Sequence, residues 1–196
     1  MKNNILICLI LTAIGSFLVA CQSNPVPKPR GYFRIDLPEK NYRELLQLYP
    51  FSFLYPDYGE VSQYKGSIKP GENTDNWLNI DFPILKAHLY LTYKPVKNNL
   101  GILIEDSHSF VYKHVSKADA INQIEFVRPE KSVYGVLFDI KGNTATALQF
   151  FVTDSVSNFL RGALYFDCEP NRDSLAPLAD FFREDIEMLM ESFSWK

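Results

Sequence analysis

The sequence predicts an α+β domain, made mainly of an antiparallel sheet covered by helices, behind a segment that directs the chain to a membrane. Three features lead to this prediction. Short alternating or apolar strands, separated by turns, fill much of the chain after residue 31. One strongly amphipathic helix closes the chain. An uncharged apolar run over residues 5–20 opens it.

The apolar run is typical of a signal peptide. Lys2 supplies a positive charge before it, and Thr12, Gly15 and Ser16 interrupt it. A membrane-spanning helix needs about 20 apolar residues and a flanking stop signal, so a span is disfavoured. The run ends in Leu18-Val19-Ala20-Cys21, the pattern of a bacterial lipobox. We therefore expect residues 1–20 to be a lipoprotein signal peptide, cleaved between Ala20 and Cys21, with lipid attached to Cys21.

The lipid on Cys21 would anchor the chain without spanning the bilayer. Each buried methylene contributes about 0.8 kcal/mol, so two or three acyl chains such as palmitate would make release negligible. Residues 21–30 follow as a tether with proline at positions 25, 27 and 29. At about 3.1 Å per residue, such a segment extends about 30 Å. We expect residues 31–196 to form a single globular domain.

Charge and cysteine content narrow the class of protein. The formal net charge is −3 and no basic cluster occurs, which argues against nucleic acid as a partner. Of the three cysteines, Cys8 would leave with the signal peptide and Cys21 would be lipidated. Cys168 then remains alone, so no internal disulfide is expected. Its acidic neighbours Asp167 and Glu169 disfavour a thiolate, which indicates an inert structural residue.

The first half of the domain is expected to contain short strands and two helices. The predicted strands cover residues 32–35, 51–54, 61–68, 77–82 and 87–93, with a short helical turn at 42–49. A helical period then predicts a helix from residue 100 to about 112, capped by Asn98 or Asn99. A second helix is expected over 117–126, with Ser116 as its N-cap and Pro129 beyond its end.

The second half has clearer patterns. Strands at 132–140, 144–153 and 158–167 are expected to form an antiparallel meander, with a hairpin turn at 141–143. Both faces of the later strands are apolar, so helices should cover the sheet on at least one side. The last helix has one apolar face and Ser174 or Asp173 as its cap, with Pro177 in the first turn. That face contains Leu178, Phe181, Phe182, Ile186, Leu189, Met190 and Phe193.

The search for chemistry gives no catalytic, cofactor-binding or metal-ligating motif. There is no HExxH or paired-cysteine spacing, no GxSxG elbow, no Walker loop and no GxGxxG. The three histidines, His88, His108 and His114, do not have ligand spacing and are interpreted as structural or surface residues. We therefore expect no catalytic residues, no metal, no cofactor and no enzyme activity.

Five acids near strand ends leave one alternative open. A carboxylate pair could perform acid–base chemistry, but no companion base or nucleophile accompanies them, so turns and caps are the favoured interpretation. These acids are Asp81, Asp139, Asp154, Asp167 and Asp173. A sugar-binding platform is a second alternative, although strand propensity explains its aromatic residues equally well. It would use Trp77, Tyr90, Tyr93 and Tyr134.

Several segments together resemble the gliding-motility lipoprotein GldD family of the Bacteroidetes. The resemblance covers nearly all of the chain after the signal peptide. The segments are 27–35 (PKPRGYFRI), 53–56 (FLYP), 134–135 (YG), 149–155 (QFFVTDS), 159–166 (FLRGALYF), 171–177 (NRDSLAP) and 191–193 (ESF).

This resemblance implies a non-enzymatic lipoprotein of the cell envelope that serves gliding motility and the linked type IX protein secretion system. It implies a structural or assembly role with other lipoproteins or machine subunits as partners, and a position on the periplasmic side of the outer membrane. The sheet with its late β-β-β-α unit is also similar to the Mog1/PsbP-like sandwich, a looser match. The tripeptides Asp154-Ser155-Val156 and Asp173-Ser174-Leu175 resemble O-glycosylation sites of this phylum.

Two rival functions belong to other classes. A periplasmic ligand-binding lipoprotein would capture a glycan or a hydrophobic small molecule, and it requires a pocket with converging polar groups. A hydrolase would require two carboxyl groups that face each other across a cleft, about 5 to 10 Å apart.

Overall fold

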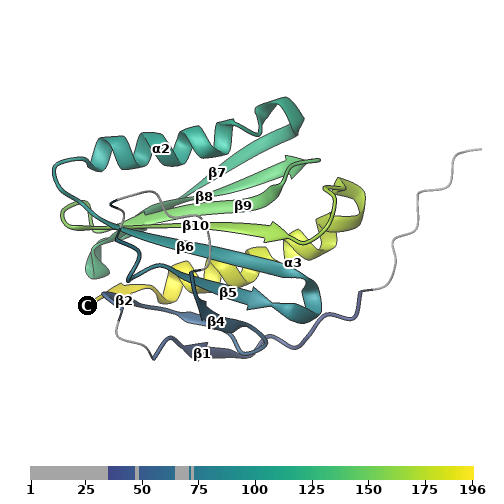
Figure 1. The fold of residues 1–196 in the computed structure, drawn as a ribbon, viewed down its shortest axis with the longest axis horizontal. Coiled ribbons are helices and arrows are strands. Elements are labelled where there is room, and N and C mark those ends of the chain that lie inside the picture. The colour runs from purple at the N-terminus through teal and green to yellow at the C-terminus, as the bar shows by residue number, and fades with distance from the viewer. Residues whose placement is uncertain (1–34, 47–48, 65–70, 72) are drawn as a thin grey trace, which may run out of the picture. The chain divides into compact units, whose positions relative to one another are not determined.

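The computed structural model describes residues 35–46, 49–64, 71 and 73–196, and Phe33–Lys196 form one compact unit. A seven-stranded antiparallel sheet crosses this unit in the order β4-β5-β6-β10-β9-β8-β7 (Figure 1). Its strands are β4 (Glu60–Gln63), β5 (Leu78–Phe82), β6 (Ala87–Pro95), β7 (Ala118–Arg128), β8 (Val133–Gly142), β9 (Thr146–Thr153) and β10 (Asn158–Phe166).

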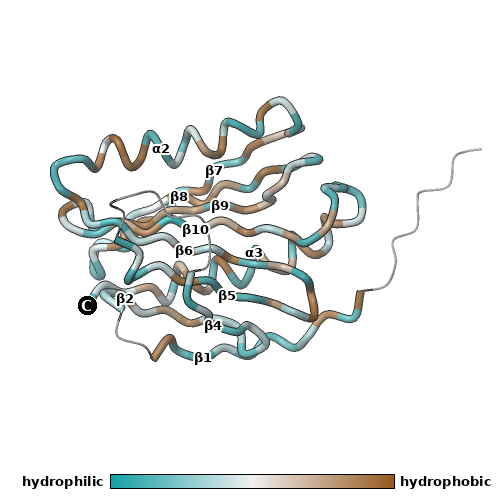
Figure 2. The backbone as a smooth tube through the Cα atoms, in the orientation of Figure 1, coloured by the Kyte–Doolittle hydropathy of each residue, from teal (hydrophilic) through white to brown (hydrophobic). Residues whose placement is uncertain are grey.

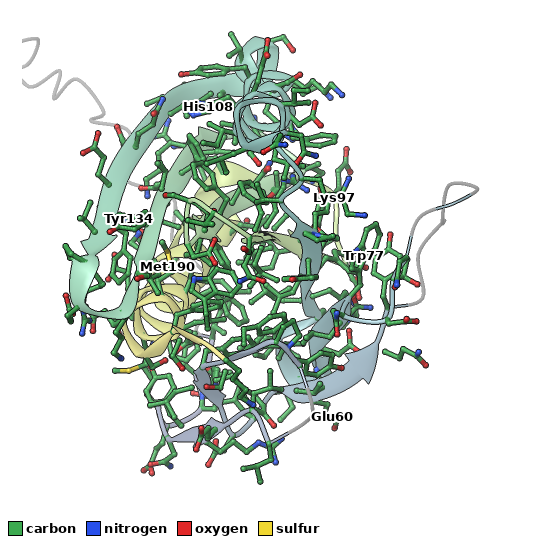
Figure 3. All side chains as sticks on the ribbon, turned by 90° about the vertical axis from the view of Figure 1, so that its left-hand side faces the viewer. Glu60, Trp77, Lys97, His108, Tyr134 and Met190 are labelled. Carbon is green, nitrogen blue, oxygen red and sulfur yellow. The ribbon has the colours of Figure 1, made fainter. Side chains whose placement is uncertain are left out.

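Two helices cover opposite faces of the sheet. Helix α2 (Leu100–Tyr112) packs on β9 and β10, and helix α3 (Arg172–Ser192) packs on β9 from the other side. Figure 3 shows His108 of α2 and Met190 of α3 on the two sides of the strands. Two small sheets flank α3: β1 (Tyr42–Glu44) pairs with β3 (Leu54–Pro56), and β2 (Phe51–Ser52) pairs with β11 (Ser194–Trp195).

The core consists of two apolar layers because side chains of a strand alternate between its faces. The larger layer lies between the sheet and α3, where Leu148, Phe150 and Val152 of β9 meet Phe182 and Ile186. The smaller layer lies under α2 and contains Leu103, Val111, Phe138, Phe151 and Phe159. In Figure 2 hydrophobic residues are frequent along the central strands of the sheet, and the connection between β5 and β6 is hydrophobic as well.

The β5–β6 and β7–β8 connections have the same backbone conformation. Pro83–Leu85 joins β5 to β6 as a 3-10 turn and ends at Lys86, whose φ is 48°. Pro129–Lys131 joins β7 to β8 and ends at Ser132, whose φ is 53°. Proline fixes the first position of each turn, and one left-handed residue returns the chain antiparallel to the previous strand.

The predicted fold class is confirmed. The structure is α+β with a mainly antiparallel sheet, and the strands at 77–82, 87–93, 132–140, 144–153 and 158–167 all form. The last three are neighbours in the sheet, as the meander requires. The helix expected at 100–112 is α2, and the C-terminal helix buries its predicted apolar face. The strand expected at 51–54 is divided into β2 and β3. The strand expected at 61–68 begins as β4, and its residues 65–68 lie outside the described residues.

Two predicted helical segments are wrong. Residues 118–126 of the expected helix lie in β7, because the backbone pairs along the strand with β8. Lys117 ends a short 3-10 turn before it. Strand β7 lies at the edge of the sheet and exposes side chains on both faces, so it lacks the apolar alternation of a strand. The turn expected at 42–49 is also wrong, since Tyr42–Glu44 pairs with β3.

The helix caps also differ from prediction. The N-cap of α3 is Asn171, whose side chain accepts a hydrogen bond from the backbone N–H of Ser174. Neither Ser174 nor Asp173 caps the helix, and Pro177 therefore lies in the second turn, not the first. Asn99 is at the N-cap position of α2, but its side chain accepts a hydrogen bond from the N–H of Lys97 instead of from the helix.

The predictions for residues 1–30 lie outside the described residues. They comprise the signal peptide, the cleavage site between Ala20 and Cys21, the lipid on Cys21 and the proline-rich tether. Most of the strand expected at 32–35 also falls there.

Candidate functional site

A hollow of about 510 Å³ lies on the face of the sheet that carries α2. Because α2 packs over β9 and β10, this hollow opens beside the helix, above β5, β6 and β10. We call it the polar groove. It is lined by Tyr64, Asn79, Asp81, His88, Tyr90, Thr92, Arg161, Ala163 and Tyr165.

The strand register builds the polar groove from rows of facing residues. Asn79, Tyr90 and Ala163 lie side by side in one row across β5, β6 and β10. Asp81, His88 and Tyr165 form the next row, and Thr92 faces Arg161 on the other side. The residues between them point to the apolar layer under α3. Alternate polar residues in three adjacent strands thus form one polar surface.

His88 is held between two carboxylates. Its Nδ1 lies 2.7 Å from Oδ1 of Asp81 and its Nε2 lies 2.7 Å from Oδ2 of Asp167. Ser62 of β4 donates a 2.7 Å hydrogen bond to the second oxygen of Asp81. Burial by itself lowers the pKa of His88, but the two carboxylate hydrogen bonds outweigh it and raise the pKa above its ordinary value. This geometry favours the imidazolium form.

Arg161 lies between the polar groove and α2. Its guanidinium carbon is 4.4 Å from the centre of the Phe110 ring, and its Nη2 donates a 2.6 Å hydrogen bond to Oε1 of Gln149. Burial lowers the pKa of Arg161, with the Tyr165 hydroxyl acting in the opposite sense. Burial and the positive charge of Arg161 together lower the pKa of His114. Arg161 remains a cation because an arginine does not deprotonate in proteins.

Asn79 contributes an unsatisfied acceptor to the wall of the polar groove. Only 4% of its surface is exposed, and its Oδ1 accepts no hydrogen bond within the described chain. A buried amide without a partner costs about 1 to 3 kcal/mol, and buried polar groups of native proteins are therefore usually hydrogen-bonded. Asn79 therefore marks a position where a bound group could donate a hydrogen bond.

A second hollow of about 220 Å³ adjoins the polar groove under α2. Arg161, Thr92 and Tyr64 line both hollows. Trp77 lies here edge-on to Tyr64, with ring centres 5.0 Å apart, and its Nε1 donates to the carbonyl of Tyr93. Figure 3 places Trp77 on the side of the sheet that carries α2. Lys94, Asp106 and Phe110 also line this hollow.

The structure brings two of the five predicted acids together. Asp81 and Asp167 meet at His88, so a companion base does stand between them, contrary to the sequence interpretation. Asp139 lies elsewhere and is buried. Its Oδ2 is 3.3 Å from Nζ of Lys141 and 2.7 Å from Nη2 of Arg183. Asp154 accepts three backbone N–H bonds in the turn before β10, and Asp173 lies in the first turn of α3. Asp154 and Asp173 therefore lie in a turn and at a helix end, as the sequence indicated.

The predicted aromatic platform does not assemble as one surface. Tyr90 lines the polar groove and Trp77 lines the adjoining hollow, but Tyr93 packs against the layer under α3. Tyr134 lines neither hollow. The structure instead adds Tyr165, whose ring centre is 5.5 Å from that of Tyr90.

The histidines have different surroundings, and only His88 lines the polar groove. His108 of α2 stacks near Tyr112 and meets Phe138 edge-on. His114 follows α2 and is partly buried. Sequence reasoning missed Asn79 and Arg161, and it did not foresee that the candidate acids Asp81 and Asp167 both pair with His88. Polar residues at alternate positions of adjacent strands were the signal that could have found this surface.

The remaining features carry no site of their own. Cys168 is a free, exposed cysteine. Within the described ranges, no three His, Cys, Asp or Glu side chains are placed to hold a metal ion. No helix of the described part of the chain is both long and apolar enough to cross a membrane.

Fold and groove together define an α+β domain with a concave, ligand-sized polar surface. The sequence profile of the gliding motility lipoprotein GldD family matches residues 22–195, which is most of the chain. The chain therefore belongs to the gliding motility lipoprotein GldD family, and it is a lipid-anchored protein of the cell envelope. A search of curated proteins finds no match.

Proposed function

We propose that this protein is a non-enzymatic assembly subunit of the gliding motility and type IX protein secretion machinery. The family match over residues 22–195 carries the proposal, because it covers the tether after Cys21 and the domain up to Trp195. In this role the domain binds other envelope lipoproteins or machine subunits and holds them near a membrane. Its function is binding, without turnover.

The geometry around His88 supports binding over catalysis. A nucleophilic serine needs a neighbouring base with a free nitrogen. Both nitrogens of His88 face carboxylates, and the hydroxyl of Ser62 donates to Asp81 instead of to the imidazole. This cluster has the contacts of a charged structural network.

Strand β7 offers a surface for a protein partner. It is the last strand of the sheet, and among the described residues only β8 pairs with it. Ile124 is 45% exposed and Val127 is 57% exposed on this edge. A long open edge with apolar side chains is suited to strand addition, in which an extended partner segment completes the backbone hydrogen bonds. We expect an extended segment of another envelope protein to pair with β7.

The anchor sets the location in this proposal. Lipid on Cys21 attaches the chain to a membrane, and the tether of residues 21–30 lets the domain extend about 30 Å from it. No acidic run follows Cys21, unlike the surface-export signals of this phylum. We therefore expect the domain to face the periplasm from the outer membrane.

Deletion of the gene tests the role directly. We expect loss of colony spreading and of type IX secretion, both restored by the wild-type chain. Unchanged spreading and secretion would overturn the proposal. A photo-crosslinking residue at Ile124 should join the protein to an identified motility or secretion component in intact cells. The same residue at Ile84, which is 78% exposed but lies in the β5–β6 connection, is the control.

Ligand binding is the second candidate function, favoured by the polar groove and its unsatisfied Asn79. The polar lining favours a glycan over a hydrophobic molecule as the ligand. A hydrolase has no such support from the acids at His88, because that histidine bridges them directly.

A further inference from the structure

We propose that the polar groove binds an acidic sugar, with the sugar carboxylate paired to Arg161 and its hydroxyl groups contacting the row that contains Asn79. This inference stands independently of the assembly role, since it concerns the open face above β5, β6 and β10 and not the edge at β7.

Arg161 brings to the polar groove a positive charge that no carboxylate of the described residues neutralises. Three other arginines of the described chain, Arg128, Arg172 and Arg183, pair with carboxylates at 2.5 to 2.9 Å. Arg161 has no carboxylate within 4 Å among the described residues, although it is partly buried. Its partners are the amide of Gln149, the ring of Phe110 and the hydroxyl of Tyr165, and none of them is a carboxylate. A desolvated cation without a counter-ion binds an anion favourably.

The surroundings leave this positive charge in place. Asp81 and Asp167 are already engaged with His88, which lies two rows away from Arg161 across the sheet. Lys94 and Asp106 line the adjoining hollow and carry opposite charges. The guanidinium also lies at the boundary of both hollows, where a ligand can reach it. Arginine holds a carboxylate well because its planar fork matches both oxygens.

Other residues of the polar groove are suited to bind the hydroxyl groups of a sugar. Asn79 supplies an unsatisfied carbonyl oxygen, and Thr92, Tyr90 and Tyr165 line the same hollow. Hydroxyl groups of a sugar donate and accept, so they suit a mixed surface of this kind. Ala163 lies between Tyr90 and Gln149 in the register, and its small side chain leaves room above the sheet. The volume of about 510 Å³ suits a small ligand.

The floor of the polar groove favours a sugar over an extended peptide as the ligand. Extended peptides are recognised at sheets mainly by backbone hydrogen bonds at an open edge. The floor of the polar groove lies on β5, β6 and β10, each of which pairs with a strand on both sides. The floor thus offers side chains only. A ligand with a ring, several hydroxyls and one carboxylate matches them best.

The test compares a trimer of galacturonic acid with the same trimer fully methyl-esterified. Calorimetry of the full chain in mild detergent should show binding of the acid, and binding of the ester at least tenfold weaker. Equal affinity for acid and ester would overturn the carboxylate assignment, and no binding of either would overturn the proposal. Inorganic phosphate is the third probe, and binding as tight as that of the acid would overturn the sugar.

Variants locate the site. Arg161→Met should bind the acid at least tenfold more weakly and should no longer distinguish acid from ester. The matched control is Arg172→Gln, which removes one arginine charge from a residue that lines neither hollow and should leave binding unchanged. Asn79→Ala should weaken both trimers without loss of thermal stability, because it removes an unsatisfied group. Full binding by either groove variant would contradict the assignment.

The pKa of His114 gives a second measure of ligand binding, independent of the calorimetry. Because the charge of Arg161 lowers the pKa of His114, a bound carboxylate should raise that pKa in a proton NMR titration. Arg161→Met should raise it without ligand, provided the other histidine signals show a folded chain. A pKa of His114 that does not respond to the acid would place the carboxylate elsewhere and overturn the pairing with Arg161.

Discussion

The hydroxyl of Tyr42 donates a 2.8 Å hydrogen bond to Oδ1 of Asp185, which joins β1 to helix α3 across 143 positions of sequence. Asp185 is buried, and it also accepts a hydrogen bond from Tyr58. Lys40 lies 3.0 Å from the same carboxylate and donates to the carbonyl of Phe181. This network fixes the segment before the sheet onto the C-terminal helix.

Replacement of Asp185 by alanine should destabilise the domain by about 3 kcal/mol or more, because Lys40 and two tyrosine hydroxyls lose a buried acceptor. Urea unfolding measures this change. Asp180→Ala is the control, since that carboxyl is 61% exposed and its ion pairs should contribute less than about 1 kcal/mol. Equal losses for both variants would show that Asp185 is not a special contact.

The two tyrosines of this network should make the domain sensitive to alkali. Burial, followed by the hydrogen bond to Asp185, raises the pKa of Tyr42 and of Tyr58 well above the ordinary value of 10.0. Above about pH 10 the unfolded chain releases these protons while the folded chain keeps them, so the free energy of unfolding falls as pH rises. Tyr58→Phe should reduce that slope in urea titrations between about pH 8 and 11. The same substitution at Tyr112, whose side chain is exposed and lies outside this network, is the control.

His88 should stabilise the domain most at low pH. Its pKa is raised in the folded state, so its contribution is complete below the unfolded value of about 6.5 and is lost as pH rises through the folded value. The difference in unfolding free energy between wild type and His88→Gln should therefore shrink as pH rises above about 6.5. A difference that stays constant from about pH 5 to 9 would show that the imidazolium is not the form held by Asp81 and Asp167.

Two glycines should respond in opposite directions to alanine. A Cβ at Gly162 in β10 would lie 2.2 Å from the ring of Phe150, which is buried, so Gly162→Ala should cost about 1 to 3 kcal/mol. A Cβ at Gly101 in α2 meets nothing within 4 Å, so Gly101→Ala should stabilise the helix by up to about 1 kcal/mol. Thermal unfolding compares the pair, and a Gly162→Ala variant as stable as the wild type would refute the contact with Phe150.

Lipid attachment makes a prediction that does not depend on the fold of the domain. Cys21→Ser should prevent acylation, and the protein should move from the membrane fraction to the soluble fraction. Cys168→Ser removes an exposed thiol of the domain and should leave the protein in the membrane fraction. If Cys21→Ser remains with the membranes, Cys21 is not the anchor.

Local patterns in the sequence determined the fold class and most of the sheet. Strands with clear alternation or with two apolar faces, such as β9 and β10, were predictable because burial dictates their side chains. The long apolar face of α3 was equally plain, since a helix on a sheet must repeat at helical spacing. The lipobox at Cys21 and the family resemblance likewise needed no structure, because both are read from consecutive residues.

The tertiary structure alone decided three features. Strand β7 depends on pairing with β8, and its exposed side chains carry no periodic signal that would indicate a strand. His88 meets Asp167 only because β6 and β10, 79 positions apart at these residues, are neighbours in the sheet. Arg161 lacks a carboxylate partner within the described chain because α2 places a phenyl ring over it instead. Each of these depends on residues that are distant in sequence: backbone pairing across the sheet creates the first two, and packing of α2 on the sheet creates the third.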